Sequence, residues 1–206
     1  MKIAVFGATG RVGNRVVNQA AEEKIEVNAL VRDRTKAQEM IPSAHLIEGD
    51  VLNPEDVEAT IHGCDIVFSG LGTDKTTTLS QAMPVIIRTM DKYDVERIIT
   101  IGTAGILNSR IEEKSYRFQT SESKRRQTFA AEEHLFAFKA LSQSGLSWTI
   151  LCPTYLPDGE AAGSIRHEVN YLPADGKKIT VGDTAQFAFD EIKKARFPQV
   201  RVGLSE

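Results

Sequence analysis

The sequence has no long hydrophobic run and no excess of positive charge. No apolar stretch approaches the length that spans a bilayer, and no charged leader precedes an apolar segment at the N-terminus. Lysine and arginine number 25 against 28 aspartate and glutamate, whereas binding to a nucleic-acid backbone normally needs a basic patch. We therefore expect a cytoplasmic protein whose partners are neither membranes nor nucleic acids.

Cysteine and linker sequence are also scarce. The two cysteines, Cys64 and Cys152, lie far apart beside predicted strands, which favours two reduced, buried thiols over a disulfide. Neither has the spacing to histidine or cysteine of a metal site, so we expect no bound metal. No stretch rich in proline, glycine or serine divides the chain, and a chain of this length buries about 70% of its unfolded surface in one core. We therefore predict a single domain over residues 1–206.

The N-terminus carries a glycine-rich turn between a strand and a helix. The apolar segment Lys2–Phe6 runs directly into the sequence GATGRVG at Gly7–Gly13. The first N–H groups of a helix lack internal acceptors, and together with the helix dipole they hold a pyrophosphate. Gly7 permits the tight turn, Gly10 lets the backbone approach the phosphates, and Gly13 lets the helix pack closely on the strand. The turn predicts a dinucleotide site, with an ordinary turn without ligand as the alternative.

Strands and helices alternate along the whole chain. We predict strands at 2–6, 26–31, 44–48, 65–70, 97–102, 147–152, near 179–181 and near 200–204. We predict helices at 11–23, 34–40, 54–61, 77–93, 127–144 and 183–195. Alternation of this kind produces parallel strands joined by right-handed crossovers. The fold class is therefore predicted to be α/β, a Rossmann-like, doubly wound and mainly parallel sheet with helices on both faces.

Seven short segments carry a family resemblance over nearly the whole chain. They are GATGRVG at 7–13, LVRD at 30–33, GDVLNPEDV at 49–57, LGT at 71–73, IITIGTAG at 98–105, SGLSWTILCPTYL at 144–156 and VGDTAQF at 181–187. Together they resemble the atypical short-chain dehydrogenase/reductases, namely the NmrA-like and biliverdin-reductase-B-like (flavin reductase-like) NAD(P)H-binding proteins. The resemblance implies a nicotinamide cofactor and does not name a substrate.

Arg32 bears on which nicotinamide cofactor is preferred. It stands at the end of the second predicted strand, near the place where NAD-preferring folds carry an acidic residue that accepts from the ribose 2′-hydroxyl. A guanidinium cannot accept that hydrogen bond, but it binds a 2′-phosphate bidentately and stacks on adenine. Arg11 and Arg34 offer further positive charge, whereas Asp33 favours NAD(H) to a smaller degree. We therefore predict NADP(H) as the preferred cofactor and NAD(H) as the alternative.

Further cofactor contacts follow from the resemblance. Residues 50–51 flank the adenine, residues 71–73 pass the ribose and pyrophosphate, and residues 153–154 meet the nicotinamide end. Asp50 is equally compatible with a turn or cap, and a proline after a strand is also an ordinary strand terminator. The residues predicted to bind the cofactor are Gly7, Thr9, Gly10, Arg11, Val12, Gly13, Arg32, Asp50, Val51, Leu71, Gly72, Thr73, Pro153 and Thr154.

The catalytic pair of the better-known short-chain reductases is missing. Those enzymes use Tyr-x-x-x-Lys, in which the lysine lowers the pKa of a proton-donating tyrosine, and no such spacing occurs here. By resemblance, Ala130 and His134 occupy the two positions, and Thr103 stands where the family often has a serine. The candidates for catalysis are therefore Thr103, His134 and Tyr155. A packed histidine and a structural threonine are the alternatives for two of them.

The missing pair favours acceptors that need no dedicated acid. Flavins and quinones form stabilised reduced anions, so a solvent proton suffices and the cofactor carries the chemistry. We therefore predict an NADPH-dependent oxidoreductase that transfers hydride to a flavin, quinone or similar conjugated small molecule. The alternative is a non-catalytic NmrA-like protein that senses NAD(P) and reports to a protein partner. A sugar-nucleotide epimerase is less favoured, because it normally needs the missing tyrosine.

The segment 111–126 is long, charged and irregular, and it follows the strand end that should face the cofactor. It is compatible with a lid over substrate or with a solvated loop. Its basic end, 124–126, is expected to be the solvated entry to the next helix. Parts of 104–126 and 156–182 are expected to form a small lobe on the substrate side.

Overall fold

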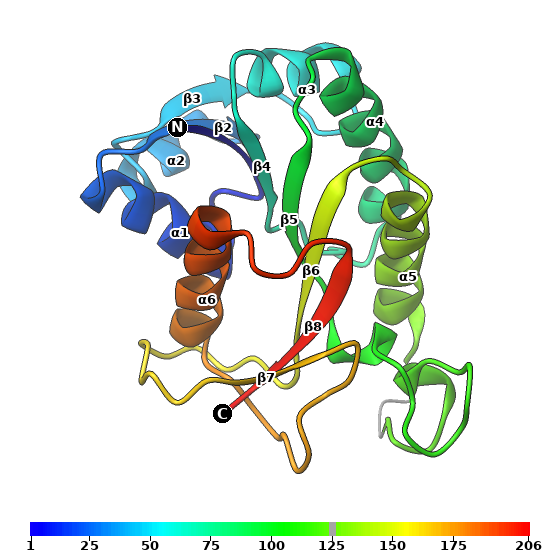
Figure 1. Ribbon diagram of the computed structural model, residues 1–206. Coiled ribbons are helices and arrows are strands. Elements are labelled where there is room, and N and C mark those ends of the chain that lie inside the picture. Colours follow the sequence, from blue (N-terminus) through cyan, green and yellow to red (C-terminus); the bar gives the residue numbers. More distant parts are fainter. Residues whose placement is uncertain (124–126) are drawn as a thin grey trace.

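Eight strands form one sheet in the order β3-β2-β1-β4-β5-β6-β8-β7 (Figure 1). The computed structural model describes residues 1–123 and 127–206. The strands are β1 Lys2–Phe6, β2 Glu26–Val31, β3 His45–Glu48, β4 Ile66–Ser69, β5 Arg97–Ile101, β6 Ser147–Pro153, β7 Arg166–Val169 and β8 Val200–Ser205. All neighbouring pairs are parallel except β7 with β8. Starting from β1, the chain first adds strands on one side of the sheet and then, from β4 on, on the other side. Doubly wound sheets bind ligands in the crevice at this point, here between the carboxyl ends of β1 and β4.

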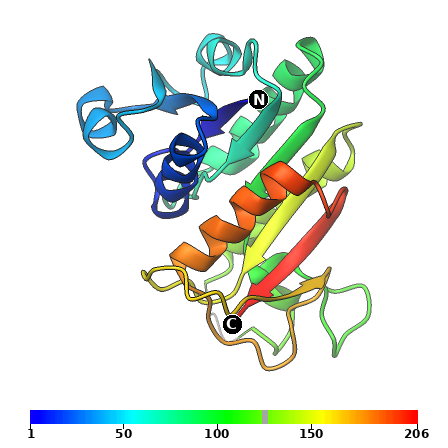
Figure 2. The same cartoon turned by 60° about the vertical axis from the view of Figure 1, so that its left-hand side comes forward.

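Helices cover both faces of the sheet, as the Rossmann-like prediction requires. They are α1 Arg11–Glu22, α2 Arg34–Met40, α3 Pro54–Ile61, α4 Thr78–Lys92, α5 Phe129–Ser142 and α6 Val181–Lys194, with 3-10 turns η1 Ala104–Ile106 and η2 Arg117–Gln119. The apolar residues of α1, α2 and α6 form one core cluster, and those of α3, α4 and α5 form the other. Figure 2 shows α6 crossing one face of β6 and β8 while α5 lies behind them. The doubly wound α/β prediction is therefore confirmed.

The strands alternate between the two cores because their side chains point to opposite faces with a period of two. In β1, Ile3 and Val5 belong to the first core, whereas Ala4 and Phe6 belong to the second, and all four are fully buried. A strand that is buried on both faces is uniformly apolar, which is why this segment was recognisable from sequence.

Side-chain caps begin α2 and α3 at the residues predicted for the starts of these helices. Asn53 accepts a hydrogen bond from the Glu55 N–H at 3.1 Å and precedes Pro54 at the first helical position of α3. Asp33 caps α2 in the same way, accepting from the Lys36 N–H at 2.9 Å. The predicted and observed bounds of these two helices agree, because the caps define their first turns.

Near the C-terminus one predicted strand is wrong and one observed strand was not predicted. The strand expected near 179–181 is absent, because Thr180 caps α6 and accepts a hydrogen bond from the Asp183 N–H at 3.0 Å. The apolar pattern there reflects burial of Ile179 and Val181 at the entry to a helix. The strand β7 was not predicted, because its sequence RHEV lies at an exposed sheet edge and has no apolar alternation.

Several expected absences concern only the part of the chain that the structure describes. No helix within 1–123 and 127–206 is long and apolar enough to cross a membrane. No group of three or more histidine, cysteine or acidic side chains in these ranges is arranged to hold a metal. Both cysteines are free and buried, as predicted, and burial raises the thiol pKa to about 11 for Cys64 and about 12 for Cys152.

Candidate functional site

The glycine turn between β1 and α1 leaves no room for side chains. Gly7 has a φ of +76°, and a Cβ at this position would lie 2.7 Å from the carbonyl carbon and oxygen of Gly70. A Cβ on Gly13 would lie 2.1 Å from the carbonyl oxygen of Gly7. The end of β1, the start of α1 and the backbone after β4 therefore pack against one another directly, which only glycine allows.

The first turn of α1 presents backbone donors toward this crevice. Gly10 is the N-cap and contributes no side-chain hydrogen bond, and its own N–H donates to the Gly7 carbonyl at 3.0 Å. The N–H groups of Arg11, Val12 and Gly13 therefore receive no acceptor from their own cap. A Cβ on Gly10 would meet the carbonyl oxygens of Gly7 at 3.1 Å and of Gly70 at 3.7 Å, so glycine keeps this approach open. The arrangement fits the diphosphate of a dinucleotide.

A cavity of about 320 Å³ lies beside the turn, at the carboxyl ends of β1, β2 and β4. We call it the β1–β2 cavity. The residues predicted to bind the cofactor that line it are Gly7, Thr9, Gly10, Arg32, Asp50, Val51, Leu71 and Gly72. Arg11, Val12, Gly13 and Thr73 do not line it, although the first three supply the helix start. Asp50 also shapes its own turn by accepting from the Leu52 N–H at 2.8 Å, so both interpretations of that residue fit the geometry.

Two cationic side chains line this cavity, whereas a nearby carboxylate is used to cap a helix. Arg32 lines the cavity with its side chain 79% exposed, and its guanidinium lies 3.4 Å from the Asp74 carboxylate. Lys36 also lines the cavity and was not predicted, because its position in the first turn of α2 depends on the cap at Asp33. Since Asp33 is used as that cap, its carboxylate is engaged in α2 and does not line the cavity.

The other two arginines considered for the 2′-phosphate point elsewhere. Arg34 donates to the Leu46 carbonyl at 3.0 Å. Arg11 donates to the Leu156 carbonyl at 2.9 Å and to the Asp158 carboxylate at 3.1 Å. In this structure Arg11 therefore holds the segment after β6 against the start of α1.

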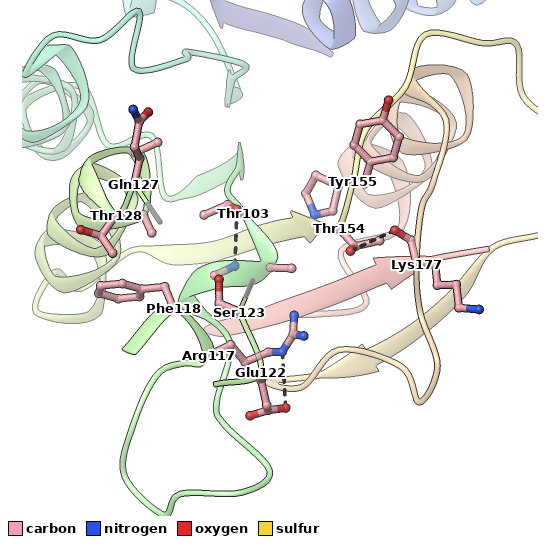
Figure 3. A pocket seen from close by; sticks show the side chains of 15 residues that line it. Thr103, Arg117, Phe118, Glu122, Ser123, Gln127, Thr128, Thr154, Tyr155 and Lys177 are labelled. Carbon is pink, nitrogen blue, oxygen red and sulfur yellow. Dashed lines mark hydrogen bonds and ion pairs between the residues drawn. The ribbon is translucent and has the colours of Figure 1, made fainter. Parts of the chain in front are cut away.

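A second cavity, also of about 320 Å³, lies at the carboxyl ends of β5 and β6 (Figure 3). We call it the β5–β6 cavity. It is lined by Thr103, Pro153, Thr154 and Tyr155, for which contact with the nicotinamide or catalysis is a prediction. The ends of β4 and β5 are neighbours in the sheet, so both cavities open at the same edge. His134 does not line it, whereas Ala130 does, on the same helix α5.

The three catalytic candidates are not brought together. The Thr103 hydroxyl oxygen accepts from the Gly105 N–H at 3.4 Å and so begins η1. Tyr155 is 62% exposed, and Figure 3 shows its phenol hydroxyl pointing away from Thr103. His134 is half-buried and stands away from the cavity lining. These roles therefore remain predictions.

The segment 111–126 is folded where the structure describes it. Asn108 and Tyr116 form an antiparallel bridge, and Glu122 accepts from the Ser109 hydroxyl and from the Arg110 N–H at 2.8 Å. The segment thereby supplies Arg117, Phe118, Glu122 and Ser123 to the wall of the β5–β6 cavity. Its basic end, 124–126, lies outside the described residues.

Glu122 carries the acidic group of this cavity wall. Burial opposes its ionisation, but hydrogen bonds from Ser109 and from the Arg110 backbone, together with nearby Arg117, lower the pKa of Glu122 below its ordinary value. The carboxyl group is therefore ionised at neutral pH and accepts hydrogen bonds. It is not suited to donate a proton.

Curated proteins of similar sequence include one that aligns over nearly the whole of both chains. The protein YwnB of Bacillus subtilis (strain 168) is 27% identical over 203 residues, which cover 94% of this chain and 92% of YwnB. Further curated relatives are longer, and the chain spans 16% to 58% of the length of four of them. The activities of those whole proteins are therefore not transferred to this chain.

Solved structures share the fold over their whole length. ChuY of Escherichia coli O157:H7, an anaerobillin reductase, has a TM-score of 0.85 at 23% identity, over 100% of this chain and 97% of ChuY. SP1627 of Streptococcus pneumoniae TIGR4, a proposed NADH-flavin reductase, has a TM-score of 0.86 at 23% identity, over 100% and 99% of the two chains. At this identity the likeness establishes the fold.

A family model described as NAD(P)H-binding matches residues 7–195. The match begins at the glycine turn and includes the segments that line both cavities. It agrees with the resemblance to NAD(P)H-binding reductases noted in the sequence. The chain therefore belongs to the NAD(P)H-binding family, and its cofactor is a nicotinamide dinucleotide.

Proposed function

We propose that the protein is an NADPH-dependent oxidoreductase that transfers hydride to a flavin, quinone or similar conjugated acceptor. The observation that carries the proposal is the β5–β6 cavity, which opens at the same sheet edge as the glycine turn. When bound, the cofactor supplies a hydride from its nicotinamide ring. The protein's own residues bind and orient the two reactants.

The preference for NADP(H) rests on Arg32 and Lys36. Both line the β1–β2 cavity at the end of β2, where the adenosine ribose binds in this fold. The contact of Arg32 with Asp74 is long and largely exposed, so a 2′-phosphate can compete for the guanidinium. The 2′-phosphate of NADP(H) would accept charge-assisted hydrogen bonds from these two side chains. The neutral 2′-hydroxyl of NAD(H) would accept weaker ones.

The choice of a conjugated acceptor rests on the proton supply. The described lining of the β5–β6 cavity offers an ionised Glu122 and the hydroxyls of Thr103, Ser123, Thr128, Thr154 and Tyr155. Reduction of a simple ketone needs a proton at the developing alkoxide, which a serine or threonine hydroxyl supplies poorly. The phenol hydroxyl of Tyr155 points away from Thr103 at the end of β5 (Figure 3). A flavin or quinone takes up the hydride as a stabilised anion and can then take its proton from solvent.

The proposal includes a small-molecule acceptor as the partner, in the cytoplasm and without nucleic acid or membrane. The acidic charge balance supports the exclusion of nucleic acid. The two free cysteines fit a reducing compartment.

A cofactor titration followed by an acceptor panel tests the proposal. NADPH and NADH binding is measured by nucleotide fluorescence, and turnover by the loss of NADPH absorbance with flavins, quinones, aldehydes and ketones. We expect tighter binding of NADPH and faster turnover of flavins or quinones than of aldehydes and ketones. Faster turnover of simple ketones would refute the argument about the proton.

One observation favours a second candidate function. Ala130 occupies the cavity wall where the short-chain reductases that resemble this chain place their tyrosine, so the wall has no dedicated acid there. This fits a protein that binds NAD(P) without catalysis and reports its redox state to a protein partner. Stoichiometric NADPH binding with no oxidation across the whole panel would favour that sensor.

A further inference from the structure

Arg117 lies in the wall of the β5–β6 cavity, and within the part of the chain that the structure describes much of the hydrogen-bonding capacity of its guanidinium is unused. The 3-10 turn η2 places it there, and its side chain is only 18% exposed. Its Nε lies 3.6 Å from a carboxylate oxygen of Glu122. Figure 3 shows the two terminal amino groups on the opposite side from Glu122, directed into the cavity. Within the described residues, neither amino group has a hydrogen-bond acceptor.

Glu122 does not satisfy the outer edge of this guanidinium. The other oxygen of Glu122 is engaged by the Ser109 hydroxyl and the Arg110 N–H, which hold the carboxylate toward the loop. Burying a cation whose N–H donors have no acceptors costs free energy, and a bound ligand that accepts from these donors removes that cost. The outer edge of a guanidinium is a planar pair of donors that matches a carboxylate or a phosphate bidentately.

Lys177, another cation among the described residues of this lining, is differently placed. Its backbone carbonyl accepts from the Thr154 hydroxyl at 3.5 Å, and in Figure 3 its ammonium group points away from the cavity. Among the described residues of this lining, Arg117 is therefore the cation directed at a molecule inside the cavity.

We propose that Arg117 binds a carboxylate or phosphate group on the hydride acceptor, so that the preferred substrates are anionic conjugated molecules. The inference rests on the proposed function, because it assigns this cavity to the acceptor. The cofactor's own diphosphate has its site at the glycine turn after β1, which leaves Arg117 for the other reactant. The ring of Phe118, from the same turn, offers an apolar surface for a flat conjugated body.

Flavin mononucleotide and riboflavin provide a matched pair for the phosphate, because both carry the same reactive ring. We expect the wild-type protein to have a KM for flavin mononucleotide roughly tenfold to a hundredfold below that for riboflavin. Arg117→Gln should remove this difference by raising the KM for the phosphorylated flavin far more than the KM for riboflavin. Arg117→Lys should retain part of it, since the charge remains and the bidentate edge is lost.

The control is Lys114→Gln, which removes one positive charge from the same loop. Lys114 is exposed and does not line the β5–β6 cavity, so the flavin preference should persist in this variant. Biliverdin and its dimethyl ester form the second arm, which tests carboxylates in place of phosphate. Selectivity in one arm only would identify which anion the site accepts.

If Arg117→Gln raises the KM for both flavins equally, the residue has a structural role and the inference is overturned. A wild-type protein that prefers the anionic member in neither arm would also overturn it. Thermal melting shows whether Arg117→Gln is folded. If no acceptor is oxidised, the proposed function fails, but the inference is still tested by flavin-fluorescence titration in the presence of NADP⁺. Tighter binding of the anionic member, lost in Arg117→Gln, would support the anion site, and equal binding would overturn it.

Discussion

Two single-methyl substitutions in the glycine turn should separate cofactor binding from folding. Gly10 and Gly13 lie three residues apart in the same motif, but an added Cβ meets very different surroundings at the two positions. At Gly10 the nearest atom is the Gly7 carbonyl oxygen at 3.1 Å, which a shift of a few tenths of an ångström relieves. At Gly13 the same oxygen would lie 2.1 Å away, which no small shift relieves.

Gly13→Ala should therefore cost stability. Overpacking typically costs about 1–3 kcal/mol, and for a chain of this size each kcal/mol lowers the melting temperature by about 2–4 °C. We expect a melting temperature roughly 2–12 °C below wild type, measured without nucleotide. Because the helix start must move, NADPH binding should weaken as well.

Gly10→Ala should keep the fold and lose the cofactor. Its backbone φ of −74° suits any residue, so the melting temperature should stay within a few degrees of wild type. The methyl group would stand where the diphosphate approaches the first N–H groups of α1. Each charge-assisted hydrogen bond lost there costs about 1.5–3 kcal/mol, so affinity should fall roughly tenfold to a hundredfold or more. Wild-type NADPH affinity in Gly10→Ala, or wild-type stability in Gly13→Ala, would refute the reasoning.

Three further substitutions or modifications test other parts of the site. Arg32→Ala should lower NADPH affinity roughly tenfold to a hundredfold and leave NADH affinity nearly unchanged, as measured by calorimetry; an unchanged ratio would contradict the role assigned to Arg32. His134→Gln should change kcat/KM by less than tenfold, because His134 does not line the cavity. A general acid normally contributes about 10²–10⁴-fold, so a loss in that range would identify His134 as the acid or as the residue that positions it. Cys64 and Cys152 should resist a thiol reagent at pH 8 until the protein is denatured. Burial raises the pKa of the two thiols to about 11 and about 12, which leaves almost no reactive thiolate. Rapid labelling of the native protein would contradict this and show that the thiols are accessible.

Much of the fold was predictable because its signals are local. The apolar segment before Gly7, and the cap and proline at Asn53 and Pro54, each specify a strand end or a helix start within a few residues. The failures occurred where a local pattern had two meanings. Ile179 and Val181 alternate around a threonine as a strand would, but Thr180 and Asp183 form the first turn of α6. The tertiary hydrogen bonds decided between the two.

The adenosine side of the site was more predictable than the substrate side for the same reason. Gly7 and Gly10 act through the backbone of a continuous segment, so their spacing alone carries the information. The role that we propose for Arg117 depends on the ion pair of its Nε with Glu122 and on the bridge between Asn108 and Tyr116 within the loop. No spacing in the sequence specifies these contacts. In this fold the glycine turn consists of consecutive residues, whereas the wall of the β5–β6 cavity depends on loop contacts that appear only in three dimensions.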